Sequence, residues 1–281
     1  MATAMTEYAG RGDPRRSMAL LWGRDEPPKR GPKPGMSVAE IVVAAIDLAD
    51  AEGLDAVSMR KVADRLGKSA MALYSYVPGK AELLDVMLDT VLGELTIAHS
   101  LDGGWRAAVM ASARDGWALY QRHPWVLQVS GARAVLGPHE LDAYEAQLRL
   151  FTGLGLSGVE MARIVGVIDS FVRGAAKAVS DARTAKQATG LSDEDWWNAR
   201  APLLAEIADA AWAARYPTIT QLDAEHAFDQ SDRPDDTTPY TVRDALDIFE
   251  FGLERLLDGI DAFICGSSPG SAASSPVDPA R

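Results

Sequence analysis

The chain has 281 residues, enough for one or two domains with packed cores. Hydrophobic residues make up 47% and charged residues 24%, which excludes collagen-like and wholly disordered chains. The net charge of −12 is unevenly spread: residues 1–80 hold 12 Lys+Arg against 10 Asp+Glu, which leaves 16 basic and 30 acidic residues for the rest. The N-terminal part can therefore touch phosphates although the whole chain is acidic.

Five prolines among the first 35 residues predict a flexible arm that sustains neither helix nor strand. Its basic residues just before the first helix suit either a DNA minor groove or a solvated linker, and we favour the linker: Arg24, Lys29, Arg30 and Lys33. Residues 266–281 predict a disordered tail.

The helical pattern begins with Ser37 and Glu40, which predict a capping box for a helix that ends at Gly53. Two short helices follow, capped by Ser58 and Ser69 and separated by Gly67. A longer helix is expected from residue 80 to about 99. Two short helices joined by a glycine-containing turn are typical of a helix-turn-helix, which indicates DNA binding.

Further helices are predicted at about 104–123, 124–130, 138–154, 157–182, 192–215 and 240–264, with a loop over 217–239. No strand pattern is found, so the predicted fold class is all-α. The helices 157–182 and 240–264 are apolar around much of their circumference, and this favours a homodimer built on them over a monomer with doubly buried helices.

The run Ser58-Met-Arg-Lys-Val-Ala-Asp-Arg-Leu-Gly67, followed by Leu73-Tyr74-x-Tyr76-Val77-x-x-Lys80, resembles the N-terminal domain of the tetracycline-repressor (TetR) family. The resemblance is specific over about residues 37–95. It implies a three-helix DNA-binding domain over 36–82, a larger helical ligand-binding and dimerisation domain over 83–265, and release of DNA when a small molecule binds.

Transferred residue by residue, the resemblance makes 69–76 the recognition helix in the major groove, starting at Ser69. Ala70, Met71 and Ala72 stand at its leading end, where apolar side chains suit thymine methyl groups. Arg60 matches a position that reaches the groove, with a guanine contact and a phosphate contact equally open. The family positions that contact the DNA phosphate backbone are matched here by Tyr74, Ser75, Tyr76 and Lys80.

The body is rich in aromatic residues, which are more often plain core, but the resemblance implies a cavity among them. The expected ligand-binding residues are Trp105, Trp117, Tyr120, Gln121, His123, Trp125, Asp169, Arg173 and Trp197. Aromatic walls and a body with net charge −14 favour a flat, multi-ring ligand that is neutral or cationic, unless Arg173 or Arg163 binds a carboxylate.

Several classes of site are not supported by the sequence. The single cysteine, Cys265, excludes a disulfide and a cysteine-based zinc site, the four histidines show no metal-ligand spacing, and no cofactor or nucleophile motif occurs. No stretch approaches the roughly 20 apolar residues of a membrane span, and no signal-peptide core is found, so we expect a cytoplasmic protein.

The sequence thus predicts a non-enzymatic, ligand-responsive regulator, with repression as the favoured output, whose partners are an operator in double-stranded DNA and a small-molecule effector. The alternatives are an all-α enzyme or a protein-interaction module with an appended DNA-binding domain. The ligand, the target genes and the roles of arm and tail are left open.

Overall fold

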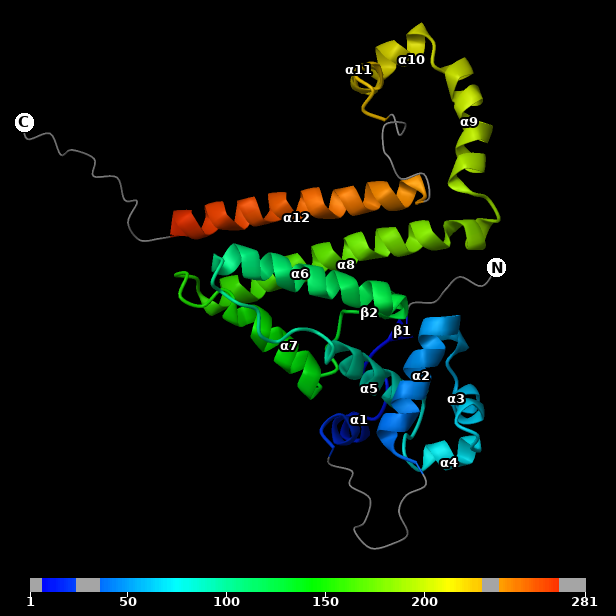
Figure 1. Ribbon diagram of the computed structural model, residues 1–281, viewed down its shortest axis with the longest axis vertical. Helices are drawn as coiled ribbons and strands as arrows, with labels where there is room; N and C mark the ends of the chain where they lie inside the picture. The colour runs from blue at the N-terminus through cyan, green and yellow to red at the C-terminus, as the bar shows by residue number, and fades with distance from the viewer. Residues whose placement is uncertain (1–6, 24–35, 229–237, 268–281) are drawn as a thin grey trace, which may run out of the picture. The chain divides into compact units, whose positions relative to one another are not determined.

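The computed structural model describes residues 7–23, 36–228 and 238–267. These residues form helices α1–α12, two short 3-10 helices (η1 and η2) and one pair of two-residue strands (Figure 1). The all-α prediction is confirmed. The chain divides into two compact units, Met1–Ala176 with Leu253–Arg281, and Lys177–Gly252, which are described separately.

The predicted helix-turn-helix motif of the first unit is built by α2 (Val38–Glu52), η1 (Leu54–Ala56), α3 (Met59–Arg65) and α4 (Ala70–Tyr74). The predicted capping box of α2 is present, with both the Ser37 and the Glu40 side chains engaged. Gly67 has φ +65°, a left-handed conformation that lets the chain turn tightly between α3 and α4. Interactions between residues close in the sequence therefore explain where the helices of this motif begin.

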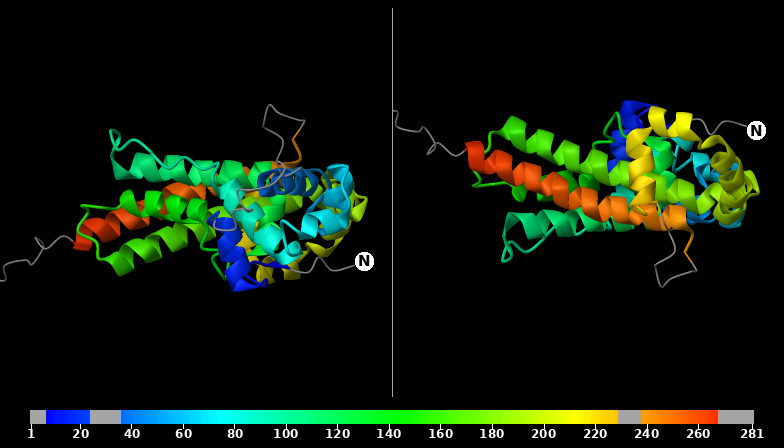
Figure 2. Two further views of the ribbon diagram at one scale, coloured as in Figure 1. Left: turned by 90° about the horizontal axis from the view of Figure 1, so that it is seen from below. Right: turned by 90° about the horizontal axis from the view of Figure 1, so that it is seen from above.

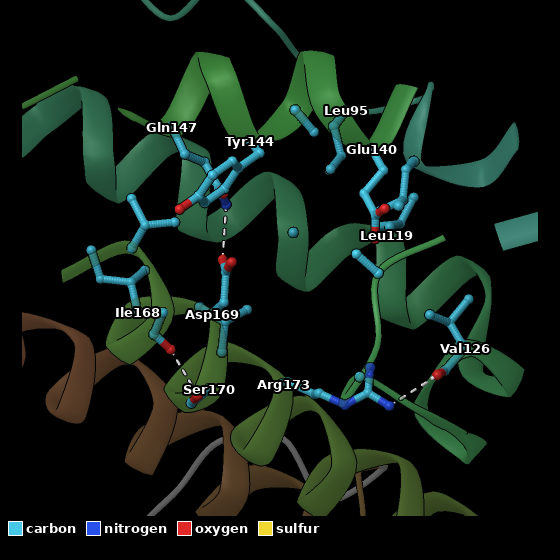
Figure 3. Close-up of a pocket in the computed structure, with 18 of the residues that line it drawn as sticks. Leu95, Leu119, Val126, Glu140, Tyr144, Gln147, Ile168, Asp169, Ser170 and Arg173 are labelled. Atoms are coloured by element: carbon cyan, nitrogen blue, oxygen red, sulfur yellow. Dashed lines mark hydrogen bonds between the residues drawn. The ribbon is translucent and has the colours of Figure 1, made fainter. Parts of the chain in front are cut away.

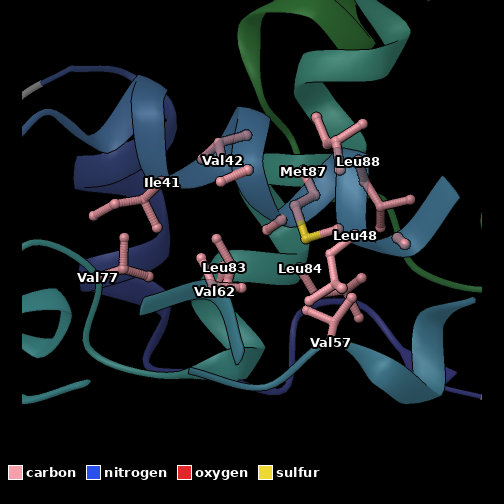
Figure 4. Close-up of a cluster of buried hydrophobic side chains, with 14 of the residues drawn as sticks. Ile41, Val42, Leu48, Val57, Val62, Val77, Leu83, Leu84, Met87 and Leu88 are labelled. Atoms are coloured by element: carbon pink, nitrogen blue, oxygen red, sulfur yellow. The ribbon is translucent and has the colours of Figure 1, made fainter. Parts of the chain in front are cut away.

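The core of this motif continues into α5 (Lys80–Leu92), as Figure 4 shows. Ile41, Val62 and Val77 have no exposed surface, and α5 adds Leu83 and Met87 to the same cluster. The prediction that this helix runs to about residue 99 was wrong. Gly93 ends it, since glycine disfavours helix by about 1 kcal/mol relative to alanine, and the Gly93 N–H already turns toward the Thr90 carbonyl.

The N-terminal segment (residues 7–22) contradicts the predicted arm. β1 (Glu7–Tyr8) pairs in parallel with β2 (Val129–Ser130), and α1 (Pro14–Leu21) packs on α5. Pro14 occupies the first turn of α1, where a missing N–H costs nothing, and the Asp13 side chain caps the helix. The basic residues 24–33 of the predicted arm lie outside the described residues.

The rest of the first unit holds α6 (Gly104–Arg122), η2 (Pro124–Gln128), α7 (Pro138–Arg149), the start of α8 (Gly158–Thr189) and the end of α12 (Tyr240–Ser267). Figure 2 shows α6 and α7 from two further directions. Residues 124–130, predicted as α-helix, form η2 and β2 instead. Among the described residues, no helix combines the length and apolarity that a membrane crossing needs.

The second unit contains α9 (Asp193–Ile207), α10 (Ala210–Arg215) and α11 (Pro217–Ala224). The predicted helix 192–215 is thus broken, because Asp209 caps a new helix at Ala210. The predicted loop 217–239 was wrong at its start, where Pro217 opens α11. Residues 229–237 of that loop and 268–281 of the predicted tail lie outside the described residues.

Candidate DNA interface and ligand pocket

The predicted recognition helix α4 is short and packs on buried residues beneath it. Ser69 caps it by accepting a hydrogen bond from the Ala72 N–H at 3.3 Å, while Leu73 and Val77 are fully buried beneath it. Ala63 of α3 is 1% exposed, and the Lys68 N–H donates to its carbonyl at 2.9 Å across the turn. Small side chains at this crossing let α3 and α4 approach closely.

The outer face of α4 presents an apolar tip beside hydroxyl groups. Met71 is 77% exposed and Tyr74 is 46% exposed, whereas Ala70, Ala72 and Tyr76 are partly buried. Met71 and the flanking alanines thus give the tip of α4 an apolar character. The Ser75 hydroxyl donates to the Ala72 carbonyl at 2.6 Å, so it would have to turn to donate to a phosphate.

Two basic residues of the predicted interface have acidic neighbours. Arg60 is exposed, and its Nε lies 4.0 Å from an Asp64 carboxylate oxygen, which is a weak pair in water. Lys80 stands at the first turn of α5 with its Nζ 3.5 Å from Glu7 of β1. The N-terminal segment therefore reaches a residue of the predicted phosphate contact.

A cavity of about 630 Å³ lies in the first unit, within the range of small-molecule sites. Its wall is mostly apolar, with aromatic rings from Tyr120, Tyr144 and Phe151. Figure 3 shows polar side chains at two places on this wall: Gln147 of α7 facing Asp169 of α8, and Arg173 reaching toward the Val126 carbonyl. The arrangement is suited to holding a ring system with a few polar substituents.

Three of the predicted ligand-binding residues, Tyr120, Asp169 and Arg173, line this cavity. Six do not. Trp105 is tilted against Phe151 at a centroid distance of 6.0 Å, Trp117 and Gln121 lie on α6 outside the lining, and Trp197 of the second unit stacks on Trp196. Aromatic content alone could not separate the cavity wall from ordinary packing.

The remaining two, His123 and Trp125, belong to a polar junction between α2 and the end of α6. His123 Nδ1 lies 2.9 Å from Asp50, its Nε2 lies 3.1 Å from Glu94, and the Trp125 indole N–H donates to Asp50 at 2.8 Å. Both residues are buried. They connect α2 to the end of α6 and are not part of the cavity lining.

The protein environment changes the acidity of groups inside the cavity. Burial raises the pKa of Asp169 above 3.8, while the hydrogen bond from Gln147 opposes the rise. Burial likewise raises the pKa of Glu140, and the pKa of the Tyr120 hydroxyl rises for the same reason although Arg173 lowers it. Desolvation of these side chains by the surrounding protein is the common cause.

Sequence reasoning missed the partners of these groups. Gln147, Tyr144 and Glu140 come from one face of α7, and Ala9 comes from the N-terminal segment. The face of α7 could have been found from its spacing of residues 140, 144 and 147, which places the three side chains in one row. No signal in the sequence placed Ala9 at the cavity.

Two family models match the chain. "Bacterial regulatory proteins, tetR family" covers residues 41–87, and "Tetracyclin repressor-like, C-terminal domain" covers residues 99–264. The transcriptional repressor DrrR1 of Streptomyces coeruleorubidus is 43% identical over 260 residues, which span 92% of this chain and 90% of the relative.

Solved structures agree with this assignment. ActR of Streptomyces coelicolor without ligand superposes with a TM-score of 0.63 at 25% identity, covering 85% of this chain and 100% of the other. ActR in complex with actinorhodin gives a TM-score of 0.63 at 27% identity, covering 81% and 96%. The second family model alone matches more than half of the chain, and DrrR1 matches almost all of it, so the chain belongs to the TetR family of non-enzymatic transcriptional repressors.

Proposed function

We propose that this chain acts as a homodimer that holds a near-palindromic operator and leaves it when a flat, multi-ring, neutral or cationic molecule fills the cavity. DNA binding through the helix-turn-helix follows from the family. The proposal adds which residues contact DNA, which helices form the dimer and which class of molecule binds in the cavity.

The observation that carries this proposal is that one helix serves both sites. On α5, Leu83, Leu84 and Met87 belong to the core beneath the recognition helix, whereas Leu88 and Leu92 line the cavity. A ligand that contacts Leu88 and Leu92 would therefore act on a helix whose other half packs on α2 and shares a core with α3 and α4. The shift in DNA affinity is then limited by the ligand's differential affinity for the two positions of α5, about 1.4 kcal/mol for each factor of ten.

The DNA contacts proposed for α4 follow its exposure. Met71 reaches thymine methyl groups, flanked by Ala70 and Ala72, while Tyr74, Tyr76 and Lys80 hold the phosphate backbone together with Ser69 and Ser75. Arg60 adds a guanine or a phosphate contact. Two such helices in a dimer would enter successive major grooves about 34–36 Å apart, so the operator should be a near-palindrome.

The homodimer is proposed through α8 and α12. Besides its buried stripe with Leu253 and Leu257, α12 exposes Phe251 at 65% and Phe263 at 45%. On α8, Val159 and Val167 are at least half exposed. Large apolar side chains in water on two long helices favour a second copy of the chain, which could cover both helices in a four-helix bundle.

Selection of bound duplexes from random DNA, followed by a small-molecule screen for release, tests the proposal. We expect a near-palindrome and at least one aromatic compound that lowers operator affinity. Arg60→Ala should weaken operator binding, whereas Arg149→Ala, the same charge change at an exposed residue of α7 outside the cavity lining, should not. A selected site without two-fold symmetry, or equal effects of the two variants, would contradict the model.

A further inference from the structure

The cavity contains the carboxylate of Asp169, for which the protein supplies few hydrogen-bond donors. Asp169 Oδ1 accepts a hydrogen bond from Gln147 Nε2 at 2.8 Å, and both side chains project from their helices into the cavity (Figure 3). Much of the Asp169 surface stays accessible because it faces this space, yet the surrounding protein is close enough to raise its pKa. An ionised carboxylate can accept about four hydrogen bonds, and a single neutral amide leaves most of that capacity unused.

Among the residues that the structure describes, Arg173 is one of two arginines that line the cavity, and it contacts groups other than Asp169. Arg173 donates to the backbone carbonyls of Val126 at 3.1 Å and Leu127 at 3.2 Å, and also to that of Val129. Its guanidinium lies over the Tyr120 ring, 5.7 Å from the centroid. All three bonds come from Nη2, and they hold the guanidinium beside these backbone carbonyls.

The other charged groups of the wall do not neutralise Asp169 either. Arg133 is exposed on the loop before α7. Glu140 adds a second acid, which accepts the Leu136 N–H at 2.7 Å. Tyr120 and Tyr144 are the remaining titratable lining residues, and burial favours the neutral form of Tyr120. The interior therefore favours a ligand that brings positive charge to Asp169.

We propose that the effector is a flat polycyclic molecule bearing a protonated amine, whose ammonium group donates to Asp169 while the amide oxygen of Gln147 accepts a further ligand donor. This inference rests on the proposed function, because it names the chemistry of the effector for the same cavity. Tyr144, which is 41% exposed, supplies an aromatic ring for the apolar part. The ammonium supplies the charge-assisted hydrogen bond that the protein withholds from Asp169, with water excluded around it.

Three probes that share one ring system test the charge. Calorimetric titration of the full-length protein with 1-pyrenemethylamine, 1-pyrenemethanol and 1-pyreneacetic acid compares a cation, a neutral molecule and an anion. We expect the amine to bind at least about tenfold more tightly than the alcohol, as a charge-assisted hydrogen bond warrants, and the acid to bind most weakly.

Two matched variants separate the local carboxylate from the acidic surface. Asp169→Asn keeps an acceptor for Gln147 but removes the charge, and should abolish the preference for the amine while the alcohol still binds. Asp181→Asn makes the same change on α8 at a residue paired with Lys177 outside the cavity lining, and should preserve the preference.

Equal affinities for amine and alcohol in the unchanged protein would overturn the inference, as would a preference that survives Asp169→Asn or the absence of binding by all three probes. Failure of the proposed function is distinguishable. If the operator is released by a neutral or anionic compound from the screen, the repressor model stands and only the amine is lost. If no compound releases the operator while the amine binds through Asp169, the amine site stands and ligand-induced release is lost.

Discussion

Replacing Ser17 by alanine tests whether the N-terminal segment is an integral part of this repressor. The Ser17 hydroxyl donates to Asp85 Oδ2 of α5 at 2.7 Å, and the Gly10 N–H donates to the other oxygen at 2.8 Å. Asp85 is 1% exposed and Ser17 is 7% exposed. The two donors from the N-terminal segment thus satisfy a carboxylate that water hardly reaches.

The expected loss follows from that burial. A hydrogen bond to a charged group contributes about 1.5–3 kcal/mol, and removal of one partner leaves a buried acceptor that water cannot replace. Ser17→Ala should therefore lower the free energy of unfolding by about 1.5–3 kcal/mol. Ser100 offers a matched control, because its hydroxyl donates to Asp102 at 2.8 Å in an exposed position, where the loss should stay within about 0.5 kcal/mol.

Urea denaturation at fixed protein concentration measures both variants, and fixed concentration keeps any dimer contribution constant. Amide hydrogen exchange adds a site-specific readout, since the Gly10 N–H should be protected in the unchanged protein and lose protection in Ser17→Ala. Equal small losses for Ser17→Ala and Ser100→Ala, together with fast exchange at Gly10, would refute the docking of this segment on α5.

Further outcomes are expected for the DNA contacts, the cavity and the loop before α7. Lys80→Ala should weaken binding to all DNA sequences alike and lower the salt slope by about one unit per subunit, whereas loss of discrimination among operators would contradict a phosphate contact. Uracil in place of thymine opposite Met71 should cost affinity in a binding titration, and an unaffected operator would place sequence readout elsewhere. Burial raises the pKa of Asp169, so the folded protein is destabilised when this carboxyl group ionises. The stability is intact below the unfolded pKa of 3.8 and is lost as the pH rises through the folded pKa. Asp169→Asn should therefore stabilise the protein at about pH 7 in urea denaturation, and by less as the pH falls. Gly137→Ala should destabilise it, since a Cβ there would lie 2.2 Å from an Asp89 carboxylate oxygen, and an unchanged unfolding midpoint would show that Asp89 can move aside.

The sequence was sufficient for the DNA-binding motif because each of its elements is coded locally. Ser37, Ser58 and Ser69 cap their helices through their own side chains, and Gly67 takes the left-handed turn. Such signals depend on neighbours within a few residues. Packing then follows from the apolar residues of these helices, among which Leu73 is fully buried.

The cavity was predictable only in part, because its wall depends on which helices meet. Asp169 and Tyr120 were expected there, while Gln147 was not, although the hydrogen bond between Gln147 and Asp169 defines the polar end of the cavity. His123 was assigned to the cavity by residue type, but its two carboxylate partners come from Asp50 and Glu94, far away in the sequence. Polar contacts between distant segments produce no periodic pattern in the sequence.

The acidic residues of α5 explain why the N-terminal segment escaped prediction. Glu82, Asp85 and Asp89 stand at a spacing that puts them on one helical face, and such a row is ordinarily a solvated surface. All three are buried, at 7%, 1% and 4% exposure. Each accepts a backbone N–H from another segment, from Asp13, Gly10 and Glu140 respectively.

Any residue type can donate a backbone N–H, so the sequence does not show which segments bind these three acidic residues. These hydrogen bonds also affect how α5 can move. The N-terminal segment and the first turn of α7 both donate hydrogen bonds to α5, the helix that lines the cavity at Leu88 and contributes Leu83 to the core shared with α3 and α4. Any movement of α5 between a DNA-binding and a ligand-bound position must carry these buried carboxylates with their donors or break the bonds, and this restricts α5 to moving together with both segments.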